Sequence, residues 1–382
     1  MTDWVVYRRD ADRRRTGVVE FRDLTFTLRL NEGASGEIVA YDGDSAGLRV
    51  GDGIIVARDS RTVVSGIVTR RERTVTADDD TTRLEFVDDT RRLAWRLTYP
   101  DPTRDADDAQ PDYDRRDGPV DDVIAEYVDA NAGESALDYR RIPGLVVAEP
   151  DGFGSDVRGK ARWRDLVEFC SNLAARCDMC AFRAVQRLGS SDITFESWAR
   201  QDRPGARFDL DGLRGSGAVV EHVYDTEFPE VTTAIAGGRG ELEDRTIVVR
   251  RDGDRETLWG RVESWLDQNN AGADDDPDDE LEALEDAADD ALRDGRAAIN
   301  LSVDAVATDA VRWPDDYDVG DRVRVRVEGE WLWRTVYAVE VNVSARGETI
   351  EPRFGDVSRR AVARILRRVG ELRRDVDQRA KG

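Results

Sequence analysis

The sequence predicts a β-rich α+β fold in which two similar small β-barrel domains flank an α/β insertion and a helix ends the chain. Three observations predict it. Short runs of alternating apolar and polar residues, with turns at roughly eight- to twelve-residue spacing, fill the first part of the chain and return after residue 217. Between these parts, from residue 119 to about 180, the apolar spacing is helical. Finally, each β-rich part contains a strand that opens with Val-Gly-Asp.

At roughly 150 residues per domain, a chain of 382 residues holds two or three domains. We expect the first barrel in residues 1–100 and a linker with the α/β insertion in residues 101–205. The second barrel is expected in residues 206–356, with an acidic helix over 277–294, and a basic helix in residues 357–382.

The first barrel is predicted from short alternating runs that turn signals separate, such as Asn31-Glu32-Gly33 and Gly51-Asp52-Gly53. Its expected strands are 18–21, 24–30, 54–56, 63–68, 84–87 and 93–99.

The insertion follows an Asp- and Pro-rich stretch over 100–118. Pro119 suits the first turn of a helix, which we expect to end near Gly133. A second helix is predicted over 163–179, and strands over 181–185 and 193–198. The second helix carries Cys170 and Cys177 on its apolar face, so we interpret these thiols as buried and structural. The alternative is a metal or redox role for the Cys177 and Cys180 pair.

The second β-rich part has expected strands over 218–224, 231–236 and 246–249. The glycines between the last two, Gly237 to Gly240, predict a tight turn, because a phosphate-binding loop would lead into a helix. Between Asp274 and Gly295, twelve acids accompany a single base, Arg293. Apolar residues there share one side of a helix: Leu281, Leu284, Ala288, Ala291 and Leu292.

The most informative pattern is internal. The segments Val50–Val56 and Val319–Val325 both read Val-Gly-Asp followed by a strand, and a second strand follows each of them. A Gly-Asp turn before a strand is common in all-β proteins. Because the two segments occupy matching places in two β-rich parts, they also indicate a duplicated barrel.

The charge composition argues against one class of binding partner. The chain has 81 Asp and Glu against 57 Lys and Arg, a net charge of −24, so nucleic acid is not expected as a general partner. Only Lys160 and Lys381 are lysines. An Asp- and Arg-rich chain that nearly lacks Lys is typical of proteins adapted to concentrated salt and resembles haloarchaeal proteins. A GC-rich genome is the alternative explanation, although it accounts poorly for the net charge.

The sequence contains no recognisable catalytic or cofactor-binding motif. The single histidine, His222, lies in a strand-like run without a nucleophile motif, and there is no Walker loop or dinucleotide fingerprint. We therefore expect no enzyme, catalytic residue, metal or cofactor. No run of about 18 apolar residues predicts a membrane span, and the first residues lack a signal peptide's pattern, so we expect synthesis in the cytoplasm.

The order of short motifs from residue 17 to 356 resembles the tail-tip baseplate hub proteins of long-tailed, siphovirus-like viruses of bacteria and archaea. The motifs are Leu28–Gly33, Gly51–Val56, Ser65-Gly66, Tyr99-Pro100-Asp101, Gly118-Pro119, Asn131-Ala132-Gly133, Ile142–Leu145, Gly237-Gly238, Trp259-Gly260-Arg261 and Tyr317–Asp321.

The resemblance implies a structural virion protein of the tail without catalytic residues. Hubs of this kind form homotrimers whose two barrels per chain give six units around a channel. They join the sixfold tail tube to a threefold tip. Implied partners are a distal tail or tube protein, the tape measure and tip or fibre proteins, with DNA present only transiently in the channel. The acidic surface suggests a haloarchaeal virus or provirus.

The last residues predict an amphipathic helix with the 3-4 spacing of a coiled coil. We name its apolar positions as candidate oligomer-interface residues: Val362, Ile365, Val369, Leu372 and Val376. Residues 357–382 hold nine cations and three acids. A three-helix bundle on the threefold axis, a helix lying on its own domain, and docking onto an acidic neighbour or DNA all remain open.

A second function class is a surface module that binds or hydrolyses carbohydrate. Trp331 and Trp333 alternate in one strand, which places both rings on one face. That face would be either a sugar platform or, as we expect, a core.

Overall fold

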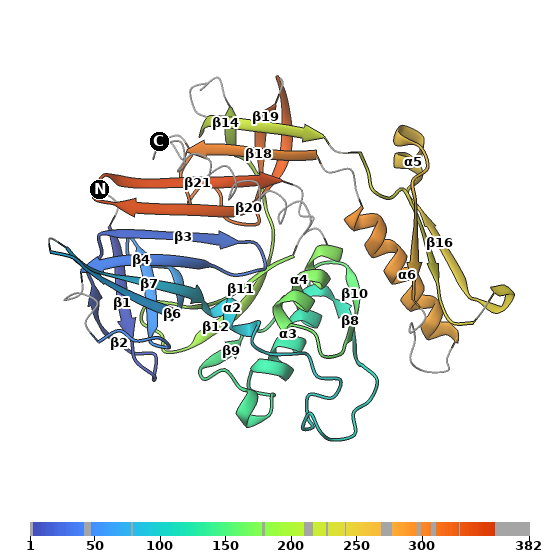
Figure 1. Cartoon of the computed structure of the whole chain (residues 1–382), viewed down its shortest axis with the longest axis horizontal. Coiled ribbons are helices and arrows are strands. Elements are labelled where there is room, and N and C mark those ends of the chain that lie inside the picture. Colours follow the sequence, from blue (N-terminus) through green and yellow to red (C-terminus); the bar gives the residue numbers. More distant parts are fainter. Residues whose placement is uncertain are drawn as a thin grey trace. The chain divides into compact units, whose positions relative to one another are not determined.

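In this computed structural model the chain divides into two compact units, which are described separately (Figure 1). Unit 1 comprises Met1–Val220 and Asp304–Arg353, and unit 2 comprises Glu221–Val303 and Phe354–Gly382. The structure describes residues 3–41, 47–77, 79–177, 180–209, 217–226, 228–240, 242–268, 277–295, 299–306, 311–327 and 329–355, with only the backbone for 217–226, 277–279, 282, 294, 299–306, 327 and 355.

Strands predominate among the described residues. They are β1 (Trp4–Arg9), β2 (Arg15–Val19), β3 (Asp23–Arg29), β4 (Ser35–Tyr41), β5 (Gly53–Arg58), β6 (Arg61–Val75), β7 (Asp80–Asp88), β8 (Asp114–Pro119), β9 (Leu145–Val147), β10 (Asp156–Ala161), β11 (Cys180–Gln186), β12 (Ile193–Ala199), β13 (Asp202–Asp209), β14 (Gly217–Thr226), β15 (Thr233–Gly237), β16 (Ile247–Arg251), β17 (Glu263–Asp267), β18 (Ile299–Val306), β19 (Arg322–Val327), β20 (Glu330–Ser344) and β21 (Gly347–Gly355). The helices are α2 (Asp89–Leu93), α3 (Val120–Ala132), α4 (Leu166–Arg176), α5 (Gly253–Trp259) and α6 (Pro277–Asp294).

One large sheet replaces the two predicted barrels. Its strand order is β18-β14-β13-β19-β20-β3-β4-β7-β6-β5-β1-β2, with β21 also paired to β20. The predicted barrels do not close in the part of the chain that is described. The reason is the antiparallel ladder between β20 and β3, from Ala338 opposite Arg29 to Ser344 opposite Asp23. This ladder makes the strands of the second β-rich part a continuation of the first sheet.

The predicted strand over 93–99 is wrong. Leu93 ends helix α2, whose N-cap is Asp88, and the chain then turns, with a single β-bridge from Leu97 to Asp165. The alternating residues that suggested a strand follow an N-cap signal, because the Asp88 carboxylate accepts a hydrogen bond from the backbone N–H of Arg91 at 2.8 Å.

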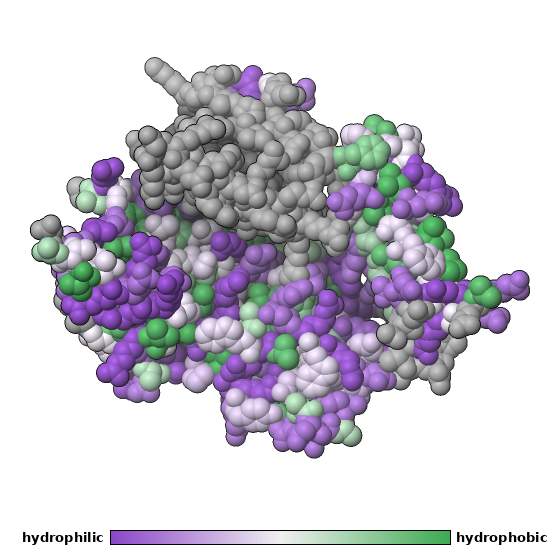
Figure 2. Space-filling view, viewed as in Figure 1, coloured by the Kyte–Doolittle hydropathy of each residue, from purple (hydrophilic) through white to green (hydrophobic). Residues whose placement is uncertain are grey.

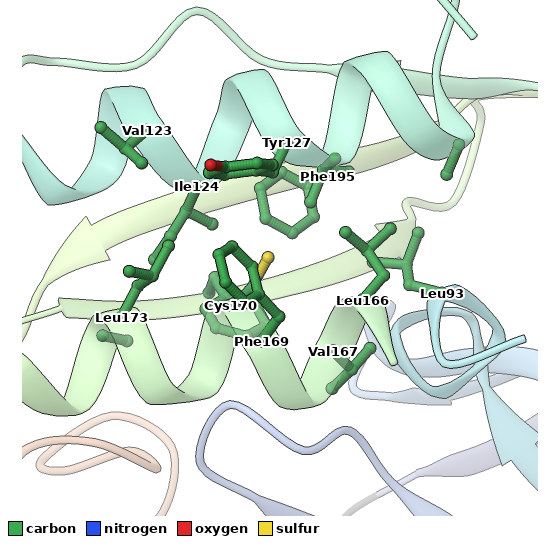
Figure 3. Packing of buried hydrophobic residues seen from close by; sticks show 14 of the residues in the cluster. Leu93, Val123, Ile124, Tyr127, Leu166, Val167, Phe169, Cys170, Leu173 and Phe195 are labelled. Atoms are coloured by element: carbon green, nitrogen blue, oxygen red, sulfur yellow. The ribbon is translucent and has the colours of Figure 1, made fainter. Parts of the chain in front are cut away.

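The α/β part of unit 1 has a core of its own (Figure 3). Helices α3 and α4 confirm the two predicted helices, although α4 is shorter than expected because Asp165 caps it and Trp163 has a positive φ of 52°. Between them Tyr127 and Phe169 meet edge to face, with ring centroids 4.8 Å apart. Strands β11 and β12 pair over the predicted ranges and supply Phe195 to the same core.

Unit 2 is a small sheet of β16, β15 and β17 covered by α6. The acidic helix spans Pro277–Asp294, as predicted. Its buried residues Leu284 and Ala288 contact the sheet residues Ala234, Ala236 and Val248. The glycine segment after β15 leads into strand β16 rather than into an α-helix, as predicted, and Gly240 has a φ of +90°. The connection is longer than the predicted tight turn, because a 3-10 helix over Leu242–Asp244 precedes β16.

Where residues are coloured, the surface in Figure 2 is largely hydrophilic, with apolar residues among charged ones. This agrees with a sequence that is 36% charged. Among the described residues, no helix has the length and hydropathy needed to cross a bilayer.

Candidate functional site

The internal repeat corresponds to two antiparallel three-stranded units. Strands β5, β6 and β7 have 6, 15 and 9 residues, and β19, β20 and β21 have the same lengths in the same order. We call these the first and second meander. The ends of their first two strands correspond at a single sequence offset, and each pair is antiparallel. The registers differ by one residue, with Gly53 opposite Ile67 but Arg322 opposite Thr335, because the first pair has a register shift between Val56 and Ala57.

The turns that open the two meanders have the same geometry. Gly51 has a φ of +95° and Gly320 a φ of +97°, in the left-handed region that favours glycine. In the first meander, Gly51 N–H donates to the carbonyl of Val68 at 2.8 Å, and Val68 N–H donates to the carbonyl of Asp52 at 2.9 Å. The Asp52 carboxylate accepts from the N–H of Arg49 at 2.7 Å.

The second meander repeats every one of these hydrogen bonds. Gly320 N–H donates to the carbonyl of Val336 at 2.8 Å, and Val336 N–H donates to that of Asp321 at 2.9 Å. The Asp321 carboxylate accepts from the N–H of Asp318 at 3.1 Å. The segments at Gly51 and Gly320 therefore fold alike, as the sequence repeat predicts.

The strands beside the meanders differ. Strand β1 lies antiparallel to β5, whereas β13 lies parallel to β19. A Cβ atom at Gly53 would lie 2.2 Å from Cγ of Arg9 on β1, so this glycine makes room for the arginine. Arg322 occupies the matching position in the second meander. The duplication is thus confined to the meander, and its flanks are adapted separately.

An ion pair joins the first meander to the second, and two tryptophan rings outside the meanders flank its arginine. Arg58, at the end of β5, contacts Glu348 of β21, with Nη2 and Oε1 2.7 Å apart. Trp4 Nε1–H donates to the other Glu348 oxygen at 2.6 Å. The guanidinium of Arg58 also lies over the rings of Trp4 and Trp313, 5.5 and 5.7 Å from their centroids.

A buried polar network joins the first meander to the α/β part. Arg9 and Asp89 form an ion pair of 2.7 Å whose side chains are only 2% and 1% exposed. Arg9 also donates to Gln186 of β11 at 2.7 Å, and Ser65 of β6 donates to Asp89 at 2.7 Å. Burial acts to raise the pKa of Asp89, but the charge of Arg9 and these hydrogen bonds outweigh it, so the pKa is lowered.

The turn between β3 and β4 makes a second contact with the α/β part. Asn31, with a φ of 56°, donates through its side-chain amide to the carbonyl of Cys180 at 3.1 Å. Its amide oxygen accepts from the N–H of Phe182 at 2.8 Å. The side chain therefore bonds to the backbone of β11 as a neighbouring strand would, and fixes the hairpin against it.

Comparison with known proteins identifies the family to which the chain belongs. The family model described as Siphovirus ReqiPepy6 Gp37-like protein matches residues 4–356. The chain belongs to this family. A comparison with curated proteins found no match.

Three solved structures share the fold of this Gp37-like chain. The tail protein of Neisseria meningitidis MC58 has a TM-score of 0.55 and 12% identity, covering 93% of this chain and 97% of that one. The prophage MuSo2 43 kDa tail protein of Shewanella oneidensis has a TM-score of 0.56 and 10% identity, covering 93% and 98%. The prophage tail protein gp18 of Listeria monocytogenes EGD-e has a TM-score of 0.56 and 10% identity, covering 97% and 98%. The Gp37-like chain therefore has the fold of phage tail structural proteins.

A cavity of about 460 Å³ lies beside the Arg58 contacts of this Gp37-like chain. It is lined by charged and aromatic groups, among them Arg58, Arg183, Trp198 and Asp318. These groups engage one another: Arg183 lies 5.1 Å from the Trp198 ring centroid and pairs with Glu196 at 2.8 Å. The described residues contain no group of three His, Cys, Asp or Glu side chains that could hold a metal ion.

The cysteines of the Gp37-like chain are free thiols: Cys170 and Cys177 are buried, as predicted, and Cys180 is buried as well. Burial raises the pKa of Cys170 and raises that of Cys180 to about 12, so both stay protonated at neutral pH. Buried, protonated thiols suit the structural interpretation rather than a redox pair.

The tryptophans considered as a sugar platform are half-buried beneath arginines. Arg324 lies 5.9 Å from the Trp331 ring centroid and 5.8 Å from that of Trp333, and Arg322 lies 5.6 Å from the latter. The guanidinium groups occupy the ring faces on which a sugar would stack. The expectation of a buried core is met only in part, because both rings keep intermediate exposure.

The candidate interface residues Val362, Ile365, Val369, Leu372 and Val376 lie outside the described residues. Sequence reasoning named the Asn31 turn as a motif but not its role, and it missed Arg9 and Arg58. An arginine in a strand carries no local signal that its partner lies far along the chain. One sequence feature points to the role of Arg9. The first copy of the repeat has Gly53 where the second has Arg322, and this glycine leaves room for the Arg9 side chain.

Proposed function

We propose that this chain is the hub of a viral tail tip: a homotrimer that joins the sixfold tail tube to a threefold tip and lines the channel through which DNA leaves. The duplicated meander is the observation that supports this most strongly. Three chains with two similar units each can present six similar surfaces to a sixfold tube, while the chain itself obeys threefold symmetry. Membership of the siphovirus Gp37-like protein family and the tail-protein fold support the same role.

In this proposal the hub acts by assembly and by gating through subunit contacts. The net charge of −24 supports a channel whose walls repel DNA, so that the genome slides without sticking. Its partners would be the distal tail or tube protein, the tape measure and the tip or fibre proteins, and its place the virion tail. Domain boundaries near residues 100, 205 and 356 belong to this proposal too.

We extend the proposal to two further features. The Asp- and Arg-rich composition supports a haloarchaeal virus or provirus as the source. The spacing of Val362, Ile365, Val369, Leu372 and Val376 supports a role for the C-terminal segment in holding three chains together.

The oligomeric state tests the proposed function. The purified full-length chain is examined in molar KCl by light scattering and mass photometry, and the expected result is a trimer that binds no polysaccharide. A matched chain ending at residue 356 tests whether the C-terminal segment contributes to trimer stability. A monomer at micromolar concentration that is depleted from solution by polysaccharide would instead establish the carbohydrate module.

A further inference from the structure

One edge of the large sheet is left open in the first meander. Strand β6 pairs with β5 from Arg61 to Ile67, and its other edge pairs with β7 as far as Val75. Beyond Val68, the β5-side edge of β6 has no strand in the described part of the chain. We call residues Thr69–Val75 the β6 edge. All seven of them are exposed.

The second meander shows how this edge is used when it is occupied. In β20 the corresponding edge follows Val336, which makes the turn hydrogen bonds that Val68 makes in the first meander. There β3 pairs with Ala338–Ser344, from Arg29 to Asp23. These β20 residues are buried or half-buried, in contrast to the β6 edge. Because the two meanders share strand lengths and turn hydrogen bonds, the difference between them is the missing neighbour.

The charge of the β6 edge favours a particular occupant. Arg70, Arg71 and Arg73 lie there with one acid, Glu72, which pairs with Arg70 at 2.7 Å. Ion pairs hold Arg70 to Glu85 at 2.9 Å and Arg73 to Asp80 at 2.7 Å, which keeps the arginines extended over β6 and β7. Two β6 edges brought together would place arginine against arginine, so the edge opposes pairing with itself and favours an acidic strand.

We propose that the β6 edge of one subunit pairs with β14 of the next subunit in the trimer. Strand β14 is ten residues long, and it contains Glu221 and Asp225 but no Lys or Arg. It pairs with β13 only at Gly217 and Ala218, so the rest of that edge is open among the described residues, while β18 holds its other edge. This matches β3, whose other edge is held by β4.

The inference rests on the proposed hub function and specifies which strands join neighbouring subunits. Within each chain the β20–β3 ladder links the two meanders, and between chains the β6–β14 ladder makes the corresponding link. Three contacts of each kind alternate and close a ring of six units. The contact between subunits is heterologous, and a rotation of one third of a turn closes it.

Disulfide trapping tests the contact in the full-length chain. Glu72→Cys and Arg73→Cys, one on each face of β6, are each combined with cysteine at successive positions from Val219 to Asp225. After mild oxidation in molar KCl, we expect a covalent trimer on non-reducing gels for positions spaced by two residues along β14. Each single variant, and Arg104→Cys in an exposed loop combined with the same β14 positions, should remain monomeric on the gel.

Charge reversal provides an independent measurement. Arg70→Glu with Arg71→Glu should raise the trimer dissociation constant at least tenfold, while Arg104→Glu with Arg141→Glu, both exposed, should leave it within twofold. Circular dichroism confirms folding of each variant. If the native chain is a trimer but no β6–β14 pair cross-links and charge reversal has no effect, this contact is wrong and the hub stands. A native chain that is monomeric in molar KCl overturns both.

Discussion

Asp88 and Asp89, adjacent at the start of α2, have opposite electrostatic surroundings. Asp89 contacts Arg9 and Arg92 and has a lowered pKa. Asp88 is buried, and burial raises its pKa to about 7 in spite of the hydrogen bonds that it accepts. Two chemically identical side chains therefore differ in charge near neutral pH because of their neighbours.

The raised pKa of Asp88 predicts a pH-dependent stability. Its folded pKa of about 7 exceeds the ordinary value of 3.8, so its contribution is fully present below about pH 4 and is lost as pH rises through 7. Asp88→Asn keeps an N-cap and cannot ionise. We expect it to raise the free energy of unfolding at pH 8 by about 1–3 kcal/mol, with the gain vanishing near pH 4. Guanidinium unfolding at several pH values in molar KCl measures this, and parallel profiles for both chains would contradict it.

The Arg9–Asp89 pair predicts a large effect from breaking one side only. Arg9→Met leaves the buried Asp89 carboxylate with Arg92 as its remaining cation. We expect a loss of about 3 kcal/mol in the free energy of unfolding, because a buried charge without its partner is costly. The double variant Arg9→Met, Asp89→Asn should recover part of the loss. Denaturant unfolding of the four chains as a double-mutant cycle measures the coupling, and a coupling below about 0.5 kcal/mol would refute this role.

At the scale of elements, the two meanders form a matched pair within one chain. The glycines that open them have nearly equal positive φ angles. A Cβ atom at Gly51 would meet nothing within 4 Å, whereas at Gly320 it would lie 3.2 Å from Leu30. The backbone requirement is therefore shared, and the packing differs.

The shared turn geometry predicts the effect of two related substitutions on stability. Gly51→Ala and Gly320→Ala should each cost about 1–2 kcal/mol through the left-handed backbone, and Gly320→Ala should cost somewhat more because of the close contact. Gly205→Ala, where φ is not positive and a Cβ atom meets nothing within 4 Å, is the control and should be neutral. Thermal unfolding in molar KCl measures all three. A neutral Gly51→Ala would contradict the shared geometry of the turns.

Some elements could be predicted from local patterns and others could not. The stripe over Val120–Val128 and the acidic run before Gly295 gave α3 and α6 nearly to the residue, because helix periodicity is a local property. The run 93–99 was misread, because its alternation resembles a strand while the cap at Asp88 starts a helix just before it. Strand β1, which holds Arg9, was not predicted at all.

At the scale of the whole molecule, the net charge of −24 predicts a strong dependence on salt. The Debye length falls from ~10 Å at 0.1 M to ~3 Å at 1 M, so salt screens the repulsion among surface carboxylates. We expect the melting temperature to rise steeply between 0.1 and 2 M KCl. Differential scanning fluorimetry across that range measures it. A melting temperature independent of KCl would favour genome composition as the reason for the charge.

The sequence by itself determined the helices, most strand positions, the duplication and the order of family motifs, because these depend on residues close together along the chain. Only the tertiary structure decided that the predicted barrels join into one open sheet, and that Arg9, Asn31 and Arg58 hold the parts of unit 1 together. Pairing β20 with β3 and burying Arg9 beside Asp89 depend on segments hundreds or tens of residues apart meeting in space. A local pattern holds no information about which distant edge or charge completes it.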